Sequence, residues 1–264
     1  MMNSSLPNSR KTQFKHLIKY RWKSLLIMGG ILLLFAIPLF ASLLLKDLKA
    51  ISIVSSSSEN ELSTLFINDI FYAIFIIPSF LLFFVGLAGI YRIIRNYIWA
   101  EGVIIGSDFL IGIKQNFKHF LIDGFVFSTL FYGVYLATVY INIPFVKYLP
   151  LIISVMLIYP VILIHMNLTV IYKNTYLHQL KNAFVIYIKR CYIYLPFFLL
   201  AIIIPIILMS FSIPLIVKYI VIFVFIYLFV PIYILSFSLY SIHQFDEIIN
   251  KEHHEELYRK GLFD

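Results

Sequence analysis

Three polar side chains occur within or beside long apolar stretches of this sequence, where polar groups are rare. Asp123, His165 and Asn167 lie in segments otherwise dominated by Leu, Ile, Phe and Val. Ionisable groups inside a membrane are costly, and they commonly mark a proton or substrate path. A structural role is the alternative, with the carboxylate in the headgroup zone and the imidazole bonded to a neighbouring helix. Both readings stay open, and these residues form a candidate intramembrane polar site.

Other arrangements that carry chemistry are not found in the sequence. The chain has no Walker-type or dinucleotide-binding glycine pattern. Its tail contains His243, Asp246, His253 and His254, but the His-Glu-x-x-His spacing of zinc hydrolases is missing. We therefore predict no catalytic residues, no cofactor and no metal site, and a protein that is not an enzyme.

The composition places the chain in lipid. Of its 264 residues, 61% are hydrophobic and only 13% are charged, whereas soluble domains carry roughly 25% charged residues. Mean hydropathy is +0.93. Membrane-spanning backbone must form its own hydrogen bonds, and apolar runs of roughly 20 residues fit helices rather than barrel strands. The single cysteine, Cys191, excludes an intrachain disulfide.

Six apolar segments are long enough to cross a bilayer as helices. They lie near Leu25–Leu45, Ile70–Ile94, Phe120–Ile141, Leu149–Tyr172, Tyr192–Met209 and Pro214–Tyr240, with a short turn at Ser210–Ile213 between the last two. The predicted fold class is all-α. The domain organisation is a basic arm at 1–23, a membrane domain at 24–241 and a charged tail at 242–264.

The basic residues predict the orientation. Seventeen of the 21 Lys and Arg residues fall in the arm, the tail and the two connectors after the second and fourth segments. The opposite connectors carry only Lys46, Lys49, Lys147 and Lys218. Because cytoplasmic loops are enriched in Lys and Arg, we expect both termini to be cytoplasmic. This topology also explains the net charge of +8 without a nucleic-acid partner.

One connector has the periodicity of an amphipathic helix. Between Asp108 and Leu121, the side chains of Phe109, Ile113 and Phe117 share a face, and Gln115 lies on the other side. We expect an elbow helix near 107–119 along the inner membrane surface, with its lysines towards anionic headgroups.

The same pattern returns later in the chain. The segment at 175–188 aligns without gaps to 108–121, and a shorter similarity occurs at 11–18. Each copy precedes a pair of apolar segments. We therefore predict a second elbow helix near 175–188, and a threefold repeat of one elbow helix plus two spans.

The stretch "DFLIGIKQNFKHFL" resembles the YesL-type family of bacterial polytopic membrane proteins of unknown function. The matching positions are Asp108, Phe109, Lys114, Asn116, Phe117 and Lys118. The resemblance implies an accessory role beside carbohydrate ABC importers, with these residues and the nearby Glu101 as a candidate partner-docking elbow. The chain differs from the family in its long basic arm and its charged tail.

Taken together, these features predict an integral plasma-membrane protein that is an accessory or interaction subunit linked to the uptake of carbohydrate or another solute. The partners would be the lipid bilayer and ABC importer subunits. A small-solute secondary transporter is the alternative, because prolines such as Pro78 and Pro160 interrupt helices as in transporter folds. A lipid-handling enzyme has the least support.

Overall fold

The computed structural model describes residues 7–56, 60–210 and 214–262, with the backbone alone at 144 and 202–210. Every element in these ranges is helical, so the all-α fold class is confirmed for the described chain. The helices are α1 (Arg10–Ser55), α2 (Glu61–Ile98), α3 (Ile105–Tyr140), α4 (Pro144–Ile153), α5 (Tyr159–Ile171), α6 (Tyr176–Ser210), α7 (Leu215–Val224), α8 (Val230–Phe245) and α9 (Lys251–His253). Single π-helical turns join α4 to α5, α7 to α8, and α8 to α9, and a short 3-10 turn follows at Glu255–Leu257.

Within the described residues, six helical stretches are long and apolar enough to cross a membrane. They are Arg10–Ser55, Glu61–Ile98, Ile105–Tyr140, Phe145–Ile171, Tyr176–Ala201 and Leu215–His253. Each contains or overlaps one predicted span. The predicted turn at Ser210–Ile213 falls mostly on residues outside the described ranges. Within the predicted arm, α1 already begins at Arg10, after the N-cap residue Ser9, whose side chain forms a capping box with Thr12.

The first three helices share one level at an end of the bundle, where Lys46 Nζ of α1 lies 3.6 Å from Asp69 of α2 and the Tyr140 hydroxyl of α3 donates to the same carboxylate. We call this the outer end of the bundle. The inner end is the opposite end, where Arg92 of α2 lies 4.0 Å from Asp108 in the first turn of α3.

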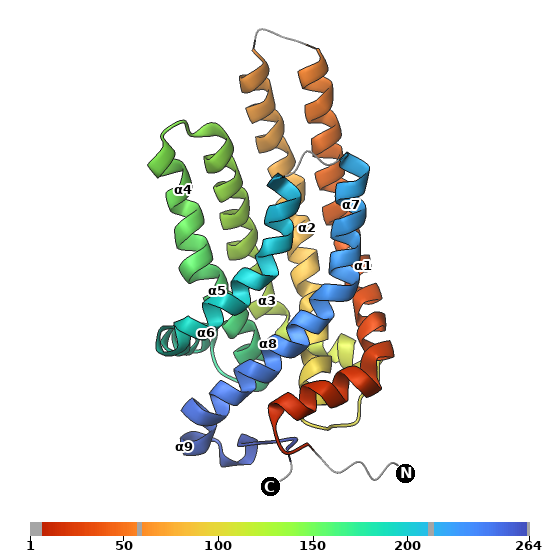
Figure 1. Cartoon of the computed structure of the whole chain (residues 1–264), viewed down its shortest axis with the longest axis vertical. Helices are drawn as coiled ribbons and strands as arrows, with labels where there is room; N and C mark the ends of the chain where they lie inside the picture. Colours follow the sequence, from red (N-terminus) through yellow and green to blue (C-terminus); the bar gives the residue numbers. More distant parts are fainter. Residues whose placement is uncertain (1–6, 57–59, 211–213, 263–264) are drawn as a thin grey trace.

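The start of α1 and the C-terminal tail lie together at the inner end (Figure 1). Arg10 donates hydrogen bonds to the carboxylate of Asp246 and to the backbone oxygen of Lys260. At the outer end, the hairpin of α1 and α2 extends beyond the other helices (Figure 1). Both ends of the described chain are therefore on one side of the bundle, as an even number of spans requires.

The first predicted elbow helix is not present as an element of its own. α3 is continuous from Ile105 to Tyr140, so the segment at 107–119 runs directly into the third span. The physical reason is the face that α3 buries against the bundle. Gly112, Asn116 and Asp123 are buried, whereas Leu110 and Phe117 are exposed. Phe109 and Phe120 lie on the same buried face, which therefore combines aromatic, small and polar side chains against the bundle.

The second predicted elbow, at 175–188, does form a rod of its own. Arg190 has non-helical backbone angles (φ −132°, ψ 24°) and divides α6 into two helices. The two predicted repeat copies therefore differ in structure, since one is continuous with its span and the other is kinked. The threefold repeat and the position of the elbows along a membrane surface stay predictions.

Candidate functional site

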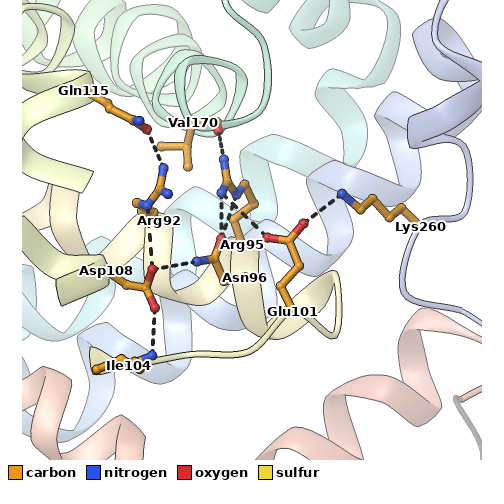
Figure 2. A network of polar contacts seen from close by, with 9 residues as sticks. All are labelled: Arg92, Arg95, Asn96, Glu101, Ile104, Asp108, Gln115, Val170 and Lys260. Carbon is orange, nitrogen blue, oxygen red and sulfur yellow. Dashed lines mark hydrogen bonds and ion pairs between the residues drawn. The ribbon is translucent and has the colours of Figure 1, made fainter. Parts of the chain in front are cut away.

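A network of charged and amide side chains fixes the inner ends of α2 and α3 (Figure 2). The Asp108 carboxylate accepts hydrogen bonds from Ile104 N at 2.8 Å and from Asn96 Nδ2 at 3.2 Å, and Arg92 Nε lies 4.0 Å away. Asp108 lies in the first turn of α3, where the helix dipole favours a negative charge. This carboxylate therefore sets the start of α3 against the end of α2.

The neighbouring arginine extends the network to α5. Arg95 Nη1 donates to the backbone oxygen of Val170 at 2.9 Å, and Nη2 donates to Asn96 Oδ1 at 2.6 Å (Figure 2). Arg92 also donates a hydrogen bond to Gln115, two turns beyond Asp108. Charge-assisted hydrogen bonds of this kind are stronger than neutral ones, so three helices are held in one arrangement at the inner end.

Glu101 connects the loop after α2 to the C-terminal tail. Its carboxylate lies 2.8 Å from Lys260 Nζ and 3.9 Å from Arg95 Nη2 (Figure 2). The Lys260 ammonium also lies over the Trp99 ring, 4.1 Å from its centroid. Glu101 was predicted as part of the docking elbow, but in the structure it makes contacts within its own chain.

The structure divides the other predicted docking residues between two faces of α3. Phe109 and Asn116 are buried, and the Phe109 ring contacts the Phe35 ring of α1 at a centroid distance of 5.6 Å. Lys114, Phe117 and Lys118 are exposed on the other face. The inward residues hold the helix in place, and the outward residues are free to meet lipid or a partner protein.

The second predicted site is a buried cluster where three helices meet. Asp123 of α3 and His165 of α5 are both 0% exposed, and His165 Nδ1 lies 2.7 Å from Asp123 Oδ2. The hydroxyl of Tyr176, the first residue of α6, donates to Asp123 Oδ1 at 2.9 Å. The structure thus brings together residues separated by 42 and 53 positions in the sequence.

Asn167 is not part of this cluster. Its side-chain amide donates to the backbone oxygen of Leu163, in the same helix, at 3.2 Å. A separation of two residues places it about 200° around the helix from His165. His119, which was not in the predicted site, does lie beside the cluster, with its ring centroid 6.0 Å from that of His165.

A third polar cluster, at the outer end, was missed by the sequence analysis. Asp69 is 4% exposed, and it accepts hydrogen bonds from the hydroxyls of Tyr135 (2.9 Å) and Tyr140 (2.7 Å). Lys46 Nζ lies 3.6 Å from the same carboxylate. Asp69 directly precedes the predicted second span, so the sequence analysis treated it as the boundary of that span and not as a candidate site residue. The cluster ties α1, α2 and α3 together at the outer end.

The C-terminal tail closes the inner end. A cleft of about 670 Å³ lies between α1, α6, α8 and the tail, and Arg10, Lys11, Tyr240 and Asp246 are among its lining residues. Beside it, the Tyr172 hydroxyl donates to Asn250 Oδ1 at 2.5 Å. Burial raises the pKa of Tyr172, and the charge of Asp246 adds to this effect. The hydroxyl therefore stays protonated and continues to donate.

Comparisons with protein-family models, with curated proteins and with solved structures find no match for this chain. The resemblance to YesL-type proteins accordingly stays a prediction that rests on the residues between Asp108 and Lys118. Function has to be argued from the geometry of the inner network and the buried cluster.

Proposed function

We propose that this chain is a plasma-membrane protein without enzymatic activity of its own, serving as an accessory or interaction subunit for the uptake of carbohydrate or another solute. Its termini and the inner end of the bundle face the cytoplasm. The orientation is supported by the seventeen basic residues at the inner end against four at the outer end.

The observation that carries the proposal is the division of α3 into an anchored face and an exposed face. Asp108 and Phe109 are held by α1 and α2, while Lys114, Phe117 and Lys118 project outward with no salt bridge among the described residues. A rigid helix that presents an aromatic ring between two lysines suits an acidic, partly apolar protein surface. The partners that we propose are subunits of an ABC importer.

Co-purification from native membranes tests this function. A photo-crosslinking residue at Phe117 should capture an importer ATPase or permease in mild detergent, and the same residue at Gly133, which is exposed further along α3, serves as the control. Charge reversal by Lys114→Glu together with Lys118→Glu should abolish capture. A chain that purifies alone and captures only lipid from position 117 would contradict the proposal.

A small-solute secondary transporter is the second candidate. It is favoured by the fully buried Asp123–His165 pair, because buried ionisable pairs occur on ion and proton paths. Uptake of labelled solutes into reconstituted vesicles tests it, with Asp123→Asn and His165→Ala expected to reduce the flux. Absence of uptake across a panel of sugars, amino acids and ions would exclude this function.

A further inference from the structure

The buried cluster has an uncompensated charge when its carboxylate is ionised. Asp123 has one basic partner among the ion pairs of the described residues, and this partner is His165 at 2.7 Å. Its second carboxylate oxygen is bound by the neutral hydroxyl of Tyr176. No lysine or arginine of the described ranges pairs with it, in contrast to Asp69, which has Lys46, and Asp246, which has Arg10.

The hydrogen bonds of His165 indicate which of its nitrogens carries the proton. When Asp123 is ionised its oxygen can only accept, so Nδ1 donates to it, whereas Nε2 is buried without a hydrogen-bond partner in the described chain. A protonated Nε2 would leave a charged donor unsatisfied, which costs more than an unpaired acceptor. With Asp123 ionised, the pair is therefore a neutral imidazole beside a carboxylate, with a net charge of −1 between two fully buried side chains.

A second histidine connects this cluster to the inner end of the bundle. His119 follows the exposed Lys118 and is itself half-buried, and its ring lies 6.0 Å from the ring of His165. Gln179 Nε2 donates to the backbone oxygen of Tyr172, so Gln179 Oε1 accepts from His119 Nδ1 at 3.1 Å. His119 therefore also has its Nε2 lone pair available to accept a proton.

We propose that Asp123, His165 and Tyr176 form a proton-binding site that exchanges one proton with the inner side of the membrane through His119. A proton from water adds to His119 Nε2 and passes to Nε2 of His165. The Nδ1 proton then shifts to the carboxylate, which leaves a neutral carboxylic acid and a neutral imidazole. No bond between heavy atoms forms or breaks, and the net charge of the cluster becomes zero.

The other ionisable groups around the site do not supply a competing charge near neutral pH. Tyr91 of α2 is a buried hydroxyl near Asp123, and Tyr233 of α8 lies near Tyr91. Together with His119 and Tyr176, these groups are neutral hydroxyls and imidazoles, which leave Asp123 as the charge that the proton removes. The inference is independent of the proposed accessory function, because it concerns the isolated chain.

Proton uptake by the full-length protein in lipid nanodiscs tests the proposal. The bound protons are counted on lowering the pH from about 8 to about 5, a range that spans histidine titration but lies above the pKa of exposed aspartates. Asp123→Asn should bind about one proton fewer than the wild type. Asp69→Asn is the matched control, and its uptake should equal that of the wild type. Equal uptake by Asp123→Asn and wild type would overturn the proposal, as would the same loss in Asp69→Asn.

Two further measurements keep the proposal falsifiable if Asp123→Asn does not fold. Wild-type protein with isotopically labelled aspartate should show an infrared band of a protonated carboxyl group that grows as the pH falls, and its absence would overturn the site. His119→Gln should lower the number of bound protons by no more than the one that His119 itself can bind. It should, however, slow the uptake after a pH jump at least tenfold. Uptake that sodium ions abolish would identify a sodium site and contradict the assignment to a proton.

Discussion

Arg10, at the start of α1, is paired with Asp246, just after the end of α8, through a hydrogen bond of 2.9 Å between buried side chains. The two residues are 236 positions apart. Together with the hydrogen bond from Arg10 to the Lys260 backbone oxygen, this contact closes the inner end of the bundle and holds the first and last spans together. It also brings the tail to the loop after α2, where Lys260 meets Glu101.

Loss of one partner from this pair should destabilise the protein strongly. Asp246→Asn leaves the Arg10 guanidinium buried without its counter-charge, which costs about 3 kcal/mol or more. Arg190→Gln, which removes the exposed pair with Glu247, should change the stability far less, because solvent screens exposed ion pairs. Thermal unfolding in detergent measures both, and equal stability of the two variants would contradict a structural role for the clamp.

Close approach of α2 and α3 requires a glycine at position 112. A Cβ atom there would lie 2.9 Å from the Gly89 Cα atom and 3.0 Å from the Ala88 oxygen, both of which are backbone atoms. Gly112→Ala should therefore separate the helices, at a cost of about 1–3 kcal/mol. At Gly133 nothing lies within 4 Å of the added atom, so Gly133→Ala should leave stability equal or higher. Unfolding by titration with a denaturing detergent compares the two.

The two phenylalanines of the predicted elbow should behave differently on substitution. Phe109 is 7% exposed, and Phe109→Ala removes a packed ring at a cost of about 3–5 kcal/mol. Phe117 is 43% exposed, so Phe117→Ala should leave the unfolding temperature unchanged. If the proposed docking function holds, Phe117→Ala should instead weaken the capture of a partner. Stability loss in Phe117→Ala equal to that in Phe109→Ala would show that both rings are structural.

The tail should detach when its contact with the loop is removed. Lys260→Ala eliminates the ion pair with Glu101 and the contact with the Trp99 ring. Both groups are partly exposed, so the global stability should change by less than about 1 kcal/mol. Limited proteolysis should nevertheless cut the tail faster than in the wild type. Lys251→Ala, which changes an exposed residue that forms no ion pair within the described chain, should leave the rate unchanged. An unaltered rate in Lys260→Ala would mean that other contacts hold the tail.

The number of apolar helices could be predicted from the sequence because their length is fixed by the bilayer. Runs of Leu, Ile and Phe between charged residues locate each helix directly, and six such helices occur in the part of the chain that the structure describes. The predicted separate elbow at 107–119 failed for a physical reason. In water-exposed helices an apolar stripe marks the buried face, but Leu110 and Phe117 of α3 face outward and Gly112 and Asn116 face inward. Helices in lipid bury small and polar residues against one another.

The candidate site could be predicted in part. Asp123 and His165 stood out because ionisable residues are rare in apolar segments, and the structure joins them. Asn167 was included because it is close to His165 in sequence, although the helical turn points it elsewhere. The roles of Tyr176, Asp69 and Arg10 depend on contacts between distant segments. A single sequence contains no signal that shows which of these distant residues contact one another.

Labelling of single cysteines in intact cells tests the central claim that the inner end of a six-span bundle faces the cytoplasm. The native Cys191 is first replaced by serine, and cysteine is then placed at Lys118 or at Asn142, both exposed. A membrane-impermeant maleimide should label Asn142→Cys in intact cells, and Lys118→Cys only after the membrane is broken. Labelling of Lys118→Cys from outside intact cells would contradict the orientation and the proposed cytoplasmic docking face.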